Sequence, residues 1–161
     1  SLATEGKAVA KSTSALSLSA IKNGTYRLAA HNGIIKLKNG QAEGDFPGGS
    51  IASGWLCSIE QVALGDVDGD GKGDAVIVIG YNGGGSGYFV NLMAVLNKNG
   101  RPVQGASYDL RDRVIVKSLK LHNQRVDLVM LDHDDSDGLA SASLKRVFSF
   151  RLIKGRWQKV S

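Results

Sequence analysis

The sequence predicts an all-β fold, mostly antiparallel, built as a sandwich or an incomplete barrel of about nine or ten strands. Three observations support this prediction. Glycine is frequent and proline rare, with 21 and 2 copies in 161 residues. Turn signals recur about every 8 to 12 residues, which is the spacing of short strands. Hydrophobic residues make up 42% of the chain, enough for a packed core.

The chain divides into a flexible N-terminal segment over 1–20 and a single β-rich domain over 21–161. Within the segment, residues 12–20 could form either a short helix or a strand. Strands are expected over 26–30 and 33–38, joined at His31 and Asn32, because tight turns flank both runs. A short strand follows Asn39-Gly40, and another lies within 51–64.

The second half of the chain shows clearer strand patterns. Residues 75–80 read Ala-Val-Ile-Val-Ile-Gly, a run rich in β-branched residues and apolar on both faces, which predicts a central strand. A strand over 88–96 leads into the turn at 97–100, and the return strand begins at Arg101. The remaining strands are expected over 114–121, 125–131, 143–153 and 156–160.

The most specific feature is an acidic loop over 66–74, which reads Asp-Val-Asp-Gly-Asp-Gly-Lys-Gly-Asp. Carboxylates at loop positions 1, 3, 5 and 9 have the spacing that lets a short loop wrap a hard cation, and the backbone carbonyl at position 7 adds another oxygen ligand. Gly71, at position 6, permits the sharp turn. Oxygen-only ligands favour Ca²⁺. The predicted ligands are Asp66, Asp68, Asp70, the carbonyl of Lys72, and Asp74.

This loop does not belong to an EF-hand. An EF-hand loop joins two helices and carries a bidentate Glu at position 12. Here strands are predicted on both sides, and position 12 is Ile77. Without that carboxylate we expect a site of moderate affinity whose role is structural, with the ion holding two strand ends together. The motif occurs once, so a propeller of repeated blades is excluded.

A second acidic loop over 132–138 leaves three interpretations open. Its aspartates could be solvated, or they could form a second or shared cation site, although their spacing does not follow the same rule. His133 and Asp135 could also act as an acid and base pair, which would make the protein a hydrolase.

The charge of the chain suggests another alternative. Formal net charge is +5, yet eight of the 15 acidic residues lie in the two acidic loops, so the rest of the chain is strongly basic. Such a surface could bind an anionic polymer or lipid headgroups. No nucleic-acid-binding motif is present. No apolar run is long enough for a transmembrane helix. The single cysteine, Cys57, is expected to be a buried hydrophobe.

The acidic loop and its flanks resemble the calcium loop of FG-GAP and VCBS repeats. More of the chain, over about 24–160, resembles a family of bacterial envelope-associated or secreted proteins of unknown function. The matching motifs are Gly84-Gly85-Ser86-Gly87, Tyr88-Phe89, the turn Leu96-Asn97-Lys98-Asn99-Gly100-Arg101-Pro102-Val103, and Asp112-Arg113-Val114. Where that family often has Cys-Cys-Pro, this chain has residues 139–142, which read Leu-Ala-Ser-Ala.

This resemblance implies a location and a style of fold, and it implies no reaction. Together with the loop it leads to one hypothesis: a non-catalytic, Ca²⁺-binding β module of the bacterial periplasm, outer envelope or exterior. Such a module would act through surface contacts with a protein or an anionic polymer. The hydrolase and the anion binder remain the alternatives.

Overall fold

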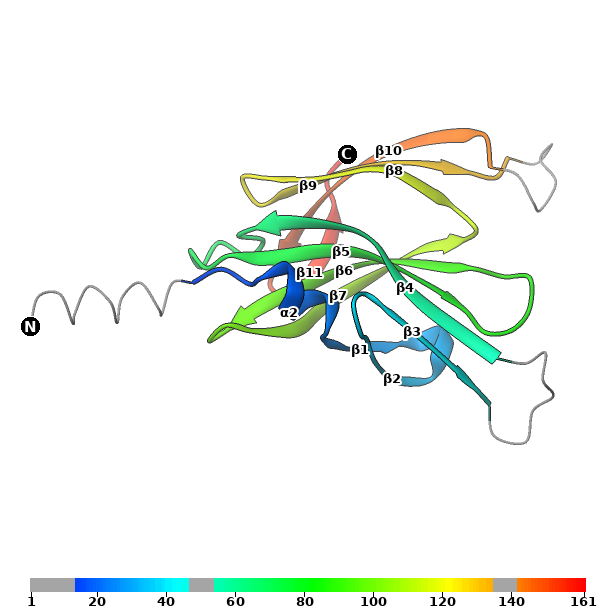
Figure 1. Cartoon of the computed structure of the whole chain (residues 1–161). Helices are drawn as coiled ribbons and strands as arrows, with labels where there is room; N and C mark the ends of the chain where they lie inside the picture. Colours follow the sequence, from blue (N-terminus) through cyan, green and yellow to red (C-terminus); the bar gives the residue numbers. More distant parts are fainter. Residues whose placement is uncertain (1–13, 47–53, 135–141) are drawn as a thin grey trace, which may run out of the picture.

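The computed structural model describes residues 14–46, 54–134 and 142–161. The described chain forms antiparallel sheets with one short α-helix near its N-terminal end, and none of its sheets closes into a barrel (Figure 1). The predicted all-β class is therefore confirmed. The described residues contain eleven strands rather than nine or ten.

The largest sheet has five strands in the order β3-β4-β5-β6-β7, and every neighbouring pair is antiparallel. Each strand follows the previous one through a hairpin, so the connections between them are local. The strands are β3 (Gln41–Asp45), β4 (Gly54–Gly65), β5 (Asp74–Asn82), β6 (Phe89–Lys98) and β7 (Arg101–Asp112).

A second sheet has four strands in the order β11-β10-β9-β8. A separate hairpin pairs the first two strands of the chain. The members of the second sheet are β8 (Ile115–His122), β9 (Arg125–Asp132), β10 (Leu144–Ile153) and β11 (Arg156–Lys159), and the hairpin consists of β1 (Thr25–Leu28) and β2 (Gly33–Lys36).

Two hydrophobic cores lie on opposite faces of β5. Ile77 and Ile79 pack beneath α2 (Leu18–Lys22) and the β1–β2 hairpin, whereas Val76 and Val78 pack against the four-stranded sheet. Successive side chains of a strand point to opposite faces, so a strand covered on both sides must be apolar throughout. This arrangement explains the continuous apolar run of β5.

The N-terminal part of the described chain is joined to the sheet. The helix α2 begins after Ser17, whose hydroxyl accepts a hydrogen bond from the Ala20 backbone N–H at 3.0 Å and caps the helix. Leu16 is buried in the core beside β5. Residues 14–20, which the sequence placed in the N-terminal segment, therefore contribute a core side chain.

The strand expected over 26–30 ends early. Strand β1 stops at Leu28, and a 3-10 turn over Ala29–His31 follows it. Asn32 closes that turn with φ 56°, a left-handed conformation that asparagine tolerates better than most residues. Cys57 is buried, as expected. No helix among the described residues has the length and apolar character needed to cross a membrane.

Candidate metal centre

The acidic loop joins β4 to β5, so it lies at one end of the five-stranded sheet between two neighbouring antiparallel strands. Its turn is held by its own carboxylates. Asp66 accepts hydrogen bonds from the backbone N–H groups of Gly69 at 2.8 Å and Gly71 at 2.9 Å. Gly71 has φ 82°, as its place in the motif predicts. The loop therefore has the wrapped shape that its spacing indicates.

The four aspartates of the loop come together. Asp66, Asp68, Asp70 and Asp74 each offer a carboxylate oxygen, and these atoms all lie within 4.8 Å of one another. Oxygens on opposite sides of a Ca²⁺ ion with bonds of about 2.4 Å would be separated by about this distance. The arrangement can hold a hard cation, and the donor set fits Ca²⁺.

Asp74 has a second role, because it is the buried member of the cluster. Only 1% of its surface is exposed. Its two oxygens accept hydrogen bonds from the backbone N–H groups of Val67 at 3.0 Å and Asn97 at 2.8 Å. One carboxylate thus ties the acidic loop to the C-terminal end of β6.

Asn97 extends this connection, although its place in the sequence predicts only a turn. Its side-chain amide donates to the backbone carbonyls of Ser14 at 2.6 Å and Gly73 at 3.1 Å, and its oxygen accepts from the Gly100 N–H at 2.7 Å. A buried, fully bonded asparagine of this kind joins the N-terminal residues, the acidic loop and the β6–β7 turn. Nothing local in the sequence indicates these long-range partners.

The carboxylates of the loop differ in their acidity. Burial, a hydrogen bond with Asp70 and the charge of Asp74 raise the pKa of Asp68 to about 6. Burial also raises the pKa of Asp74, with a contribution from the neighbouring carboxylates. For Asp66, burial is outweighed by the hydrogen bonds from Gly71 and Gly69, and its pKa is lowered. A bound cation would relieve the repulsion between the carboxylates that helps to raise the pKa values of Asp68 and Asp74.

The remaining predicted ligand is the carbonyl of Lys72. The backbone N–H of Lys72 donates a hydrogen bond to the Asp70 carboxylate at 2.9 Å, which places Lys72 within the same turn. Its coordination of the ion stays a prediction. Ile77, at position 12, is fully buried in β5, so the loop is flanked by strands and lacks the position-12 ligand of an EF-hand.

The second acidic loop is described only at its start. The Asp132 carboxylate is buried and accepts a hydrogen bond from Arg146 Nε at 2.9 Å, with Arg111 Nη1 at 3.6 Å. A carboxylate neutralised by guanidinium groups is a poor cation ligand. His133 Nε2 lies 3.2 Å from the Arg113 carbonyl. Asp135 lies outside the described residues, so its pairing with His133 and the hydrolase function stay predictions.

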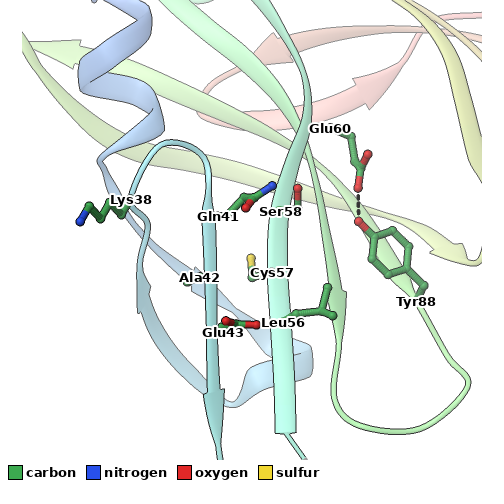
Figure 2. A pocket seen from close by; sticks show the side chains of 9 residues that line it. All are labelled: Lys38, Gln41, Ala42, Glu43, Leu56, Cys57, Ser58, Glu60 and Tyr88. Carbon is green, nitrogen blue, oxygen red and sulfur yellow. Dashed lines mark hydrogen bonds between the residues drawn. The ribbon is translucent and has the colours of Figure 1, made fainter.

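A cavity of about 600 Å³ lies over β3 and β4, and His133 does not line it (Figure 2). The Tyr88 hydroxyl donates a hydrogen bond to the Glu60 carboxylate at one side of the cavity, as Figure 2 shows. Burial and the neighbouring Glu60 raise the pKa of Tyr88. The cavity therefore presents two carboxylates, Glu43 and Glu60, beside apolar side chains such as Leu56.

Comparison of the chain with known protein families, with curated proteins and with solved structures finds no significant match. The resemblance to the bacterial family therefore stays a prediction that rests on the quoted motifs. What stands independently of it is an all-β protein with four clustered aspartates that could hold a metal ion.

Proposed function

We propose that this protein is a non-catalytic, Ca²⁺-stabilised β module of the bacterial envelope or exterior that acts through surface contacts. The observation that carries the proposal is the convergence of Asp66, Asp68, Asp70 and Asp74 on one small volume. An extracellular or periplasmic location suits such a site, because free Ca²⁺ is far more abundant outside cells than inside them.

The role proposed for the ion is structural. The acidic loop connects two adjacent strands, and Asp74 links it to the β6–β7 turn through Asn97. A cation bound to the native loop and absent from the unfolded chain stabilises the fold by mass action. At a concentration of 100 times Kd, this effect is about 2.7 kcal/mol.

Thermal unfolding with and without Ca²⁺ tests this proposal. For a domain of this size, that stabilisation corresponds to a rise in Tm of about 5 to 10 °C. Asp68→Ala should abolish the rise, because it removes the side-chain ligand at loop position 3, and because Asp68 is exposed the change does not disturb the core. In a Ca²⁺-free buffer the same variant should be at least as stable as wild type, since it removes a carboxylate whose ionisation is opposed by its neighbours.

Glu43→Gln provides the matched control, because Glu43 is an exposed carboxylate on β3 that takes no part in the cluster. It should keep the full Ca²⁺-dependent rise in Tm. Equal Tm values for wild type with Ca²⁺ and with chelator would contradict the proposal. A rise of the same size in Asp68→Ala would show that the ion binds elsewhere.

The Ca²⁺-dependent rise in Tm should also depend on pH. The pKa of Asp68 is about 6 in the folded apo protein against an ordinary value of 3.8. Its contribution to apo stability is therefore fully present below pH 3.8 and is lost as the pH rises through 6. Protons compete with Ca²⁺ at this carboxylate, so the rise in Tm should be smaller at about pH 5 than at about pH 7.5. A rise independent of pH over this interval would exclude Asp68 as a ligand.

A further inference from the structure

Three cationic side chains from three strands meet at a small cavity on the side of the molecule where the two sheets join. Arg111 comes from β7, Arg146 from β10 and Lys159 from β11, and all three line a cavity of about 140 Å³. β7 belongs to the five-stranded sheet, whereas β10 and β11 belong to the other. The cluster therefore exists only because the sheets pack together.

The carboxylates at this cavity are already engaged. Asp132 accepts from Arg146 Nε and from the His133 backbone N–H, and it lies near Arg111. Asp109 accepts a hydrogen bond from the backbone N–H of Arg111 at 2.8 Å. Three cations thus face two carboxylates, and the cavity keeps an excess of positive charge.

The guanidinium groups also keep donors for a ligand. Arg146 bonds Asp132 through Nε, and its two terminal amino groups have no hydrogen-bond partner among the residues that the structure describes. The Arg111 side chain is 70% exposed despite its proximity to Asp132. Lys159 Nζ lies 4.1 Å from the centroid of the Phe148 ring, a cation–π contact that holds the ammonium group at the cavity.

A β-bulge in β7 places Arg111 on the same face of the sheet as Val90. Asn91 pairs with Asp109 and Val90 pairs with Arg111, so Leu110 is an extra residue on β7. Paired residues share one face of a sheet, and Val90 belongs to the core between the two sheets. Without the bulge Val90 would pair with Leu110, and Arg111 would point to the opposite face. Arg111 adopts φ 93° here, a conformation that residues other than glycine seldom adopt.

We propose that Arg111, Arg146 and Lys159 form a binding site for one tetrahedral oxyanion, a phosphate or phosphate monoester group. Guanidinium groups match the geometry of such an anion, and an added ammonium supplies a third positive charge. The size of the cavity agrees with this ligand class, since sites for drug-sized molecules measure about 300 to 1,000 Å³. This site is independent of the Ca²⁺ loop.

Titration of inorganic phosphate into the full chain, in Ca²⁺-free buffer at constant ionic strength, tests the proposal. Two-dimensional NMR should show saturable shifts of the Arg111 backbone amide and of the Arg146 Nε–H group. Arg111→Gln and Lys159→Gln should each weaken the fitted affinity at least tenfold. Arg146 is left intact, because its removal would leave the buried Asp132 without its closest partner.

Arg156→Gln is the matched control, because Arg156 is an exposed cation on β11 that does not line the cavity. It should bind phosphate as wild type does. Shifts that grow linearly without saturation, or that are equally reduced in the control, would overturn the proposal as non-specific charge attraction. Equal affinity of the wild type and both cavity variants would overturn it as well.

A second set of titrations identifies the source of the phosphate group. Glycerol 2-phosphate represents a soluble monoester, and vesicles of phosphatidylcholine with or without phosphatidic acid represent a membrane. Binding of the soluble ester by wild type, lost in Arg111→Gln, supports a small-molecule ligand. Retention only on vesicles that contain phosphatidic acid, again lost in Arg111→Gln, supports a lipid headgroup. Failure of every phosphate-bearing probe would overturn the site.

Discussion

Replacing Asp74 with alanine is expected to destabilise the protein by about 2 to 5 kcal/mol even when no cation is present. Asp74 is buried, and its two oxygens accept hydrogen bonds from the backbone N–H groups of Val67 and Asn97. Both donors are themselves in buried residues. Alanine would leave these donors unsatisfied, and each would cost about 1 to 3 kcal/mol. Relief of the repulsion between Asp74 and the other loop carboxylates offsets only part of this loss.

Urea unfolding in excess chelator measures this effect, with the midpoint and the slope recorded separately. Asp70→Ala is the matched control, because Asp70 is an exposed carboxylate of the same loop. In chelator it should change stability by about 0.5 kcal/mol or less, although it should lose the Ca²⁺-dependent stabilisation. Equal midpoints for the two variants in chelator would show that Asp74 serves only the metal ion.

Phe150→Ala is expected to destabilise the protein by about 3 to 5 kcal/mol, which is the usual cost of removing a buried aromatic side chain. Phe150 has 0% of its surface exposed and lies in the core between the two sheets. Its ring makes edge contacts with Tyr108, Phe148 and Trp157, at centroid distances of 4.8, 6.1 and 6.2 Å. The substitution would therefore leave a cavity and remove ring contacts from both sheets.

The same urea experiment, with thermal unfolding beside it, measures this loss, and Tm should fall by roughly 10 °C or more. Val147→Ala is the control on the same strand, because Val147 is 60% exposed. It should change the free energy of unfolding by about 0.5 kcal/mol or less. A loss for Phe150→Ala no larger than that of the control would contradict the packing of the two sheets.

Much of the fold was predictable from sequence because its signals are local. The apolar run at 75–80 predicted a strand buried on both faces, and β5 is that strand. Turn signals placed most hairpins within a few residues of their observed positions. The count of strands was lower than observed, and the first strand was expected to extend to residue 30 although it ends at Leu28. That strand ends where its pairing with β2 ends, at Leu28 and Gly33, because a 3-10 turn over Ala29–His31 makes the connection.

The acidic loop shows the same dependence on local signals. Its four carboxylates lie within nine residues, and the turn that gathers them is made by the loop itself through bonds such as Asp66 to Gly69 and Gly71. Sequence alone could therefore identify the cluster. The second acidic loop was harder to interpret, because the partners of Asp132 are an arginine on β10 and another on β7. Those partners assign Asp132 to an ion-pair network.

By itself, the sequence determined the all-β class, the central strand and the candidate metal loop, since each follows from residue types at fixed short spacing. Only the tertiary structure decided that Asn97 joins the loop to Ser14, and that Arg111, Arg146 and Lys159 line one cavity. These groups are far apart in the chain and meet only when the sheets pair and pack. The spacing of a motif records local geometry, whereas a site built across two sheets depends on register and packing that the whole chain must establish.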